Sequence, residues 1–226
     1  MKKYFNYQIT KDVIVKNLIT IETLDIGLGF SYPEEIHSFF EFAYIDSGSI
    51  CCAVENDIVE LRQGDFYLIP PHSRHSYFVQ KNQIATIFII CFDSHSECLS
   101  ILDERITLSK EAKRMVSEIL TESKYAFIFP FEKKLRPTPT PTFGAQQMVE
   151  NNIEKLLIYL IRDRINENKN IVFVMNSMEL ENSLSDDIIL LLKKHVYDTL
   201  SLDQLSKETH YSKTFINTIF KRNTGL

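Results

Sequence analysis

The sequence lacks a long hydrophobic run and an excess of positive charge. Its longest apolar stretch, residues 84–92, falls far short of the ~18 residues that a membrane-spanning helix needs, so no membrane partner is expected. Lys and Arg number 25 against 30 Asp and Glu, a formal charge of −5, which excludes a uniformly basic nucleic-acid coat protein. The start, residues 1–7, has two lysines without an apolar segment after them, so no secretion signal is expected.

Metal-binding cysteine spacing and the common catalytic motifs are absent as well. The four cysteines, at positions 51, 52, 91 and 98, form no C-x-x-C pair, and adjacent cysteines are poor disulfide partners. Buried, reduced thiols in a cytoplasmic protein are therefore expected. No phosphate-loop, dinucleotide-binding, zincin or nucleophile-elbow motif occurs. Because nothing indicates nucleophilic catalysis, we do not expect an enzyme, and we expect no cofactor.

Residues 1–108 have the pattern of short antiparallel strands. Turn signals recur roughly every eight to twelve residues, which is typical of a sandwich or barrel. Asp46-Ser47-Gly48 predicts a turn between two strands, and Asn56-Asp57 predicts a tight hairpin connection. We expect this region to form an antiparallel β-barrel.

From residue 109 the apolar period changes from two to about 3.6, which indicates helices. Ser109 is predicted to cap a first helix, and a second helix is predicted over residues 145–165. A proline-rich loop at 130–142 separates them, because proline cannot sustain a helix. The apolar stripe of the second helix can pack on the barrel or pair with a second copy. We predict that residues 109–165 are a dimerisation segment and that the protein is a homodimer through the 145–165 helix.

The end of the chain has the pattern of a helix-turn-helix. Residues 166–185 are polar and predict a linker, and residues 186–226 predict a small all-α subdomain. Its last helix begins at Ser212 and directs short polar and cationic side chains outward, as base edges and phosphates require. These side chains belong to Lys213, Thr214, Asn217, Thr218 and Lys221. An ordinary helical hairpin with a solvated outer face has the same pattern.

Three segments in this region resemble the first helix-turn-helix of the AraC family of bacterial transcription regulators. They are Ser201-Leu202-Asp203-Gln204-Leu205-Ser206, Tyr211-Ser212-Lys213-Thr214-Phe215-Ile216 and Phe220-Lys221-Arg222-Asn223-Thr224-Gly225. The resemblance implies that Thr214, Asn217 and Thr218 read bases, while Lys213 and Lys221 lie nearer phosphates. The family's module has two such motifs joined by a long helix, whereas this sequence ends at residue 226. We therefore expect a truncated fragment with weakened operator binding, because fewer phosphates are contacted.

Two stretches of the strand region resemble the cupin signatures that the same family commonly carries. The first has Gly29, Glu35, His37, Glu41 and Gly48 at the cupin spacing, with Glu35 in place of the first histidine. The second has Gly64, Pro70, His72 and His75, with His72 in place of a glycine. Positions 35, 37 and 41 are all odd, so on a strand their side chains share one face.

The resemblance implies an N-terminal domain that binds a small-molecule effector. We predict that its pocket is lined by His37, Phe39, Glu41, His75 and Tyr77. The alternative is a metal-dependent cupin enzyme that uses Glu35, His37, Glu41 and His75, since imidazole and carboxylate suit iron, manganese or zinc.

Taken together, the sequence predicts an α+β protein with a cupin-like barrel, two helices and a partial helix-turn-helix. The predicted function is cytoplasmic transcription regulation, with double-stranded DNA and a small-molecule effector as partners.

Overall fold

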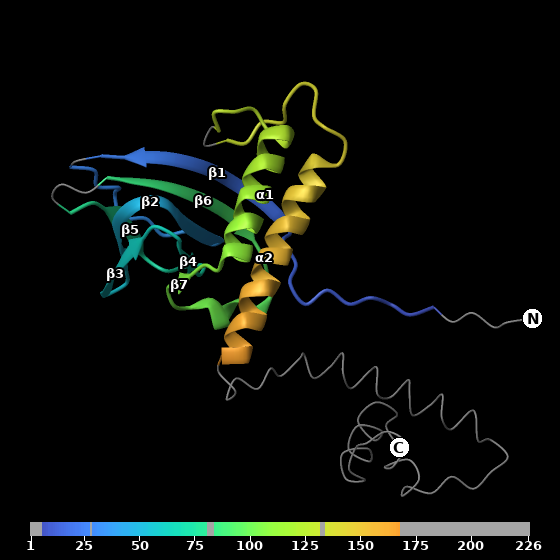
Figure 1. The fold of residues 1–226 in the computed structure, drawn as a ribbon, viewed down its shortest axis with the longest axis horizontal. Helices are drawn as coiled ribbons and strands as arrows, with labels where there is room; N and C mark the ends of the chain where they lie inside the picture. Colours follow the sequence, from blue (N-terminus) through green and yellow to red (C-terminus); the bar gives the residue numbers. More distant parts are fainter. Residues whose placement is uncertain (1–5, 28, 81–83, 132–133, 168–226) are drawn as a thin grey trace, which may run out of the picture. The chain divides into compact units, whose positions relative to one another are not determined.

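The computed structural model describes residues 6–27, 29–80, 84–131 and 134–167 (Figure 1). Within these residues seven strands precede two long α-helices, with a short 3₁₀ helix between the sixth and seventh strands. The elements are β1 (Asn17–Ile26), β2 (Phe40–Val54), β3 (Asp57–Arg62), β4 (Asp65–Ile69), β5 (His75–Phe78), β6 (Ala85–Asp93), η1 (Glu97–Leu102), β7 (Ile106–Thr107), α1 (Lys110–Ala126) and α2 (Ala145–Glu167).

The predicted DNA-binding segment, residues 186–226, lies outside the described residues. The same holds for the linker predicted at 166–185, except for residues 166 and 167, which end α2. The expected DNA contacts of Lys213, Thr214, Asn217, Thr218 and Lys221 therefore stay predictions.

The strands pair antiparallel in the order β1-β6-β2-β4-β7, and β3 and β5 both pair with the second half of β2. The prediction of a closed barrel is wrong. Among the described residues β1 pairs only with β6 and the two-residue β7 only with β4, so no ladder joins the two ends of the sheet. The described strands form an open antiparallel sheet.

The turn predicted at residues 46–48 is replaced by a bulge within β2. The pairing with β6 changes register between Ile45 and Ser47, and β2 continues to Val54. Gly48 has a φ of +74°, and a Cβ atom on it would lie 1.8 Å from the carbonyl oxygen of Ile84. A bulge bends a strand, so β2 passes from the partners β4 and β6 to the partners β3 and β5. A hairpin forms as predicted, but its two-residue turn is Glu55-Asn56 and not Asn56-Asp57, since Val54 pairs with Asp57 and β3 begins there.

Gly48→Ala is expected to destabilise the protein more than Gly29→Ala. Both glycines have positive φ angles, so each alanine carries a conformational cost of about 1–2 kcal/mol. Only the alanine at position 48 also overlaps the neighbouring backbone, because nothing lies within 4 Å of a Cβ at position 29. Urea unfolding of both variants measures the difference, and equal losses would rule out the close approach at residue 48.

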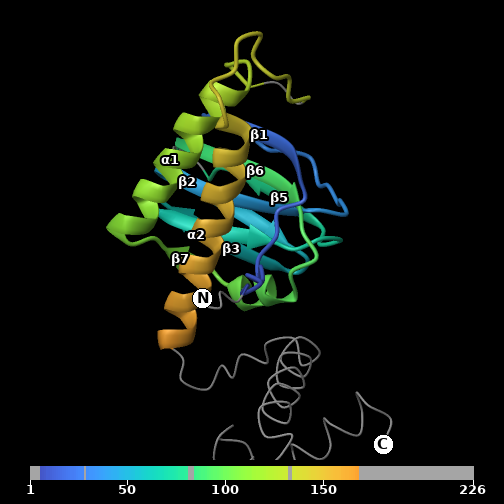
Figure 2. The same ribbon diagram turned by 90° about the vertical axis from the view of Figure 1, so that its right-hand side faces the viewer.

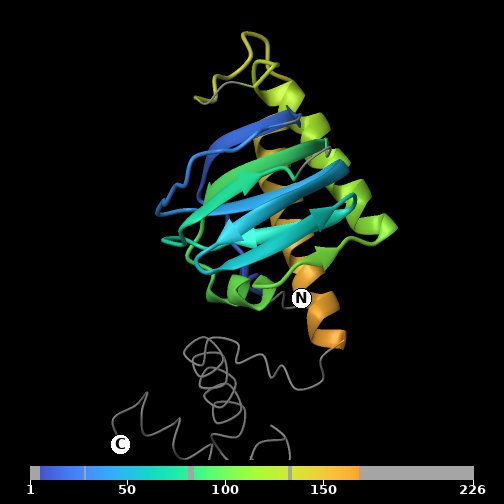
Figure 3. The same cartoon turned by 90° about the vertical axis from the view of Figure 1, so that its left-hand side faces the viewer.

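Helices α1 and α2 lie side by side over one face of the sheet (Figures 2 and 3). The cap predicted at Ser109 is confirmed, because its Oγ accepts a hydrogen bond of 3.2 Å from the Ala112 N–H. The second helix begins near the predicted position, and its apolar stripe is buried within the chain. A second copy would therefore have to contact another face of α2, and the homodimer stays a prediction.

Two apolar layers hold the described region together. Phe42 packs against Phe66 and Phe88 on the helix side of the sheet, with ring centroids 5.2 and 6.1 Å apart. Side chains alternate along a strand, so Ala43 and Ile45 point to the opposite face, where they join a core with residues of β3 and β5. Among the described residues, no helix combines the length and the apolar character that crossing a bilayer requires.

Candidate functional site

A cavity of about 170 Å³ lies on the face of the sheet opposite the helices. Alternation along β1 places Thr20, Glu22, Leu24 and Ile26 on its wall. The strand register places Thr20 opposite Cys91 and Cys91 opposite Glu41, so these three form one row across β1, β6 and β2. Segment 30–39 and β5 supply the facing wall, with Phe30, Tyr32, Glu35, His37, Phe39 and Tyr77.

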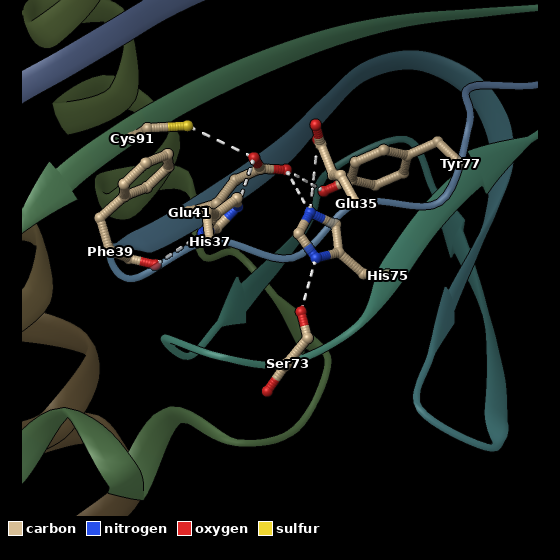
Figure 4. Close-up of polar contacts among 8 residues, drawn as sticks. All are labelled: Glu35, His37, Phe39, Glu41, Ser73, His75, Tyr77 and Cys91. Carbon is tan, nitrogen blue, oxygen red and sulfur yellow. Dashed lines mark hydrogen bonds and ion pairs between the residues drawn. The ribbon is translucent and has the colours of Figure 1, made fainter.

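Four side chains meet at one end of this cavity (Figure 4). One ligand atom from each of Glu35, His37, Glu41 and His75 can be chosen so that all four lie within 4.8 Å of one another. Glu41 belongs to β2 and His75 to β5. Glu35 reaches them because its backbone forms two hydrogen bonds with His75, of 2.9 and 3.0 Å. The odd-numbered residues 35, 37 and 41 are thus brought together, although only Glu41 lies within β2.

Both imidazoles are oriented by backbone carbonyls. The Nδ1 atom of His37 lies 2.9 Å from the Phe39 carbonyl oxygen, and that of His75 lies 3.0 Å from the Ser73 carbonyl oxygen. A carbonyl oxygen can only accept, so each Nδ1 carries a proton and each Nε2 is directed toward the carboxylates.

The two Nε2 atoms lie near carboxylates without forming hydrogen bonds. The Nε2 of His37 is 3.5 Å from Glu41, and the Nε2 of His75 is 3.6 Å from Glu35 and 3.8 Å from Glu41. Neither buried Nε2 has a hydrogen-bond partner among the described residues. Because an unsatisfied buried polar atom is costly, the two Nε2 atoms are suited to bind a further group.

Glu41 is an ionised carboxylate in the interior. Its Oε1 accepts a hydrogen bond of 2.7 Å from the Tyr77 hydroxyl, and its Oε2 accepts one of 3.3 Å from the Cys91 thiol. Burial raises the pKa of Glu41, but the interactions with His37, His75 and Tyr77 outweigh burial and lower the pKa to about 2.

The neighbours of Glu41 respond to its charge. Burial lowers the pKa of His75, but the Glu41 carboxylate and the Ser73 carbonyl outweigh burial, so the pKa of His75 is raised. Burial and the charge of Glu41 raise the pKa of the Tyr77 hydroxyl and of the Cys91 thiol. Both groups therefore keep their protons and remain donors to Glu41.

The four-residue cluster fits a divalent transition-metal ion. Two imidazole nitrogens and two carboxylates are a donor set that iron, manganese or zinc accepts. The contacts of 3.5–3.8 Å suit two ligands that each lie ~2.1 Å from a shared ion. The Nδ1–carbonyl hydrogen bonds match the outer contacts that orient metal-binding histidines.

The part of the chain that forms the cavity is similar to a known protein family. Residues 25–112 match the AraC-like ligand binding domain. This AraC-like region contains the four-residue cluster and most of the cavity wall, and no DNA-binding helix-turn-helix is part of the match. Comparison with curated proteins gives no match.

Solved structures similar to this chain include cupin proteins. AerE from Microcystis aeruginosa is 24% identical, with 32% of this chain and 34% of that chain covered and a TM-score of 0.30. A cupin 2 conserved barrel domain protein from Salinispora arenicola is 20% identical, with 31% and 60% covered and a TM-score of 0.30. A cupin protein from Bacteroides fragilis is 17% identical, with 42% and 89% covered and a TM-score of 0.34. The chain covers 34, 64 and 61% of the first three structures that it matches.

Four of the five residues predicted for the effector pocket, His37, Phe39, Glu41 and Tyr77, line the cavity of the AraC-like region. His75 is absent from the lining because its side chain is fully buried against Glu35 and Glu41. The cavity wall also includes Thr20 and Glu22 of β1, which were not predicted. The sequence signal that could have revealed them is the strand-like alternation that puts residues 20, 22, 24 and 26 on one face. This alternation begins before residue 25, where the family match starts.

Proposed function

We propose that this chain is an AraC-type transcription regulator whose AraC-like region senses a small-molecule effector. The main support for this proposal is the cavity. Its buried polar end lies within the region that matches the AraC-like ligand binding domain. Buried polar atoms without partners favour a bound molecule that supplies them. Because the match is to a ligand-binding domain, we propose regulation rather than catalysis.

The effector function is tested by thermal unfolding of the 226-residue chain across a library of small metabolites. A compound that binds only the folded state raises the melting temperature, and above Kd the rise grows with the logarithm of its concentration. We expect at least one compound smaller than about a dozen heavy atoms to do so. A library that produces no concentration-dependent shift would refute sensing by this cavity.

The DNA-binding function is proposed for residues 186–226 on the basis of the helix-turn-helix resemblance. Selection from random duplex DNA at low salt tests it. Asn217→Ala and Thr218→Ala are expected to change which sequences are recovered, whereas Lys213→Ala weakens binding to all sequences and reduces its salt dependence. Lys110→Ala, an exposed charge removal on α1, is the matched control and leaves recovery unchanged. Recovery of no preferred sequence would count against DNA reading.

A second candidate function, a metal-dependent cupin enzyme, is favoured by one observation. Within the described part of the chain, the Nε2 atoms of His37 and His75 have no hydrogen-bond partners, and they face Glu35 and Glu41. A bound divalent ion would supply Lewis-acid or oxygen-activating chemistry. The ion would be held by Glu35, His37, Glu41 and His75. Tyr77 and Cys91 would fix the orientation of Glu41 through their hydrogen bonds to it.

Metal analysis of protein purified without chelators or metal-affinity resin tests this candidate. Up to one ion per chain is expected, and His75→Ala is expected to lower metal affinity at least tenfold because a direct ligand is removed. His95→Ala removes an exposed histidine and is the matched control. Protein that neither carries nor takes up Mn²⁺, Fe²⁺ or Zn²⁺ would exclude a metal enzyme, and turnover of a substrate would separate an enzyme from a metal-containing sensor.

A further inference from the structure

The cavity has an aliphatic floor at the end away from the four-residue cluster. Leu24 of β1 lies opposite Ile87 of β6, and both side chains line the cavity. Ile87 precedes Cys91, the residue opposite Glu41, by four positions on β6, so this pair lies well along the strands from the cluster. Ile26 follows Leu24 on the same face of β1 and also lines the cavity.

Two aromatic side chains of segment 30–39 line the cavity at the same end. Glu35 pairs with His75 inside the cluster, whereas the Tyr32 N–H donates to the Tyr77 carbonyl oxygen at 2.7 Å. Phe30 lies further still from the cluster, since its carbonyl oxygen accepts a hydrogen bond of 3.2 Å from an N–H beyond the end of β5. We call the part of the cavity lined by Leu24, Ile26, Ile87, Phe30 and Tyr32 the apolar end.

Some of the carbon surface at the apolar end is not covered by the protein. Leu24, Phe30 and Tyr32 pack against the buried core but are themselves only partly buried, and all three line the cavity. Removing such surface from water is favourable, so carbon atoms of a ligand would bind against it. The apolar end is therefore a site for the hydrocarbon part of a bound molecule.

The size and shape of the cavity limit this hydrocarbon part to one flat ring. A cavity of about 150 Å³ with apolar walls holds benzene, and this one has a volume of about 170 Å³. The rings of Phe30 and Tyr32 are tilted by 33° with their centroids 6.3 Å apart. Aromatic rings attract one another at centroid distances of about 4.5–7 Å, so a third ring beside this pair gains contacts that an aliphatic ring does not.

We propose that the effector carries a single uncharged aromatic ring, which binds at the apolar end against Leu24, Phe30 and Tyr32. This inference rests on the proposed sensing function and names the chemical class of its ligand. It concerns the end of the cavity away from the four-residue cluster, so it applies equally when that cluster holds a metal ion and when it contacts a polar group of the effector. A charged ring, or a sugar ring covered with hydroxyls, would lose hydration against these carbon atoms.

Titration calorimetry of the full 226-residue chain with four alcohols tests the proposal. Benzyl alcohol carries one aromatic ring, cyclohexylmethanol one aliphatic ring, 2-naphthalenemethanol two fused rings and myo-inositol a fully hydroxylated ring. We expect benzyl alcohol to bind at least threefold more tightly than cyclohexylmethanol, because only the aromatic ring gains the contacts with Phe30 and Tyr32. The two-ring alcohol and inositol should not bind, the first because of its size and the second because of its hydration.

Two substitutions at the apolar end change its size in opposite directions. Leu24→Phe fills the floor of the cavity and should abolish binding of benzyl alcohol. Ile58→Phe enlarges an exposed side chain of β3 that does not line the cavity, and it should leave binding unchanged. Phe30→Ala enlarges the apolar end and should allow 2-naphthalenemethanol to bind, a gain that damage to the fold would not produce.

Three results would overturn the proposal: no binding of benzyl alcohol, binding of inositol as tight as that of benzyl alcohol, or wild-type affinity for benzyl alcohol in Leu24→Phe. If Leu24→Phe does not fold, Phe30→Ala decides, and a folded Phe30→Ala chain that still rejects the two-ring alcohol refutes the site. The outcome for sensing is separate. If a metabolite without an aromatic ring raises the melting temperature while benzyl alcohol does not bind, sensing stands and the aromatic ligand is refuted.

Discussion

Glu41→Gln is expected to lower the free energy of unfolding of the metal-free chain by about 3 kcal/mol at pH 7. The folded environment lowers the pKa of this buried carboxyl from 4.5 to about 2, so it favours the ionised form. Stability from such a group is fully present above its unfolded pKa and is lost as the pH falls through its folded pKa. The wild-type chain should therefore lose this contribution between about pH 5 and pH 2.

Urea unfolding at a series of pH values between 7 and 2 measures this effect. Glu41→Gln should remove most of the acid-dependent loss, because glutamine does not titrate. Glu34→Gln changes an exposed residue of the segment that carries Glu35, and it should behave like the wild type. If both variants showed the wild-type pH dependence, the buried carboxylate would not be the source of acid sensitivity.

Phe42→Ala is expected to cost about 3–5 kcal/mol, the usual loss when a fully buried phenylalanine is truncated. The Phe42 side chain has no exposed surface and contacts the rings of Phe66 and Phe88 on the helix side of the sheet. Alanine at this position leaves a cavity between the sheet and the helices.

Circular dichroism follows this unfolding, since the sequence contains no tryptophan to serve as a fluorescent probe. Phe143→Ala is the matched control, because Phe143 is fully exposed and its loss should change stability by less than about 0.5 kcal/mol. Equal effects of the two substitutions would be incompatible with helices that cover this face of the sheet.

A sensed effector and a metal ion would bind to the same cluster of residues around Glu41. The carboxylates and imidazoles around Glu41 can surround one divalent ion or contact one bound effector. Measurements on protein with and without metal therefore separate the two uses. Any coupling to DNA binding would require the effector to bind more tightly to one conformation of the chain than to another.

Several features with a local signal were predicted correctly, although the turn expected at residues 46–48 was not. The cap at Ser109, the start of α2 near residue 145 and the hairpin that ends at Asp57 each depend on residues within a few positions of one another. The spacing of Glu35, His37 and Glu41 was also informative, because it brought those side chains to one place even across a break in the strand.

The sequence by itself determined the change from strands to helices near residue 109, the positions of the two helices and the chemical identity of the clustered side chains. Only the tertiary structure decided that the sheet is open, that β2 runs through residues 46–48, and that β1 contributes Thr20 and Glu22 to the cavity wall. It also decided that the stripe of α2 is buried within the chain and that two Nε2 atoms have no hydrogen-bond partner among the residues that the structure describes. The reason is physical. Periodicity and capping are set by neighbouring residues, whereas strand register, burial and the pairing of polar atoms depend on segments far apart in the sequence.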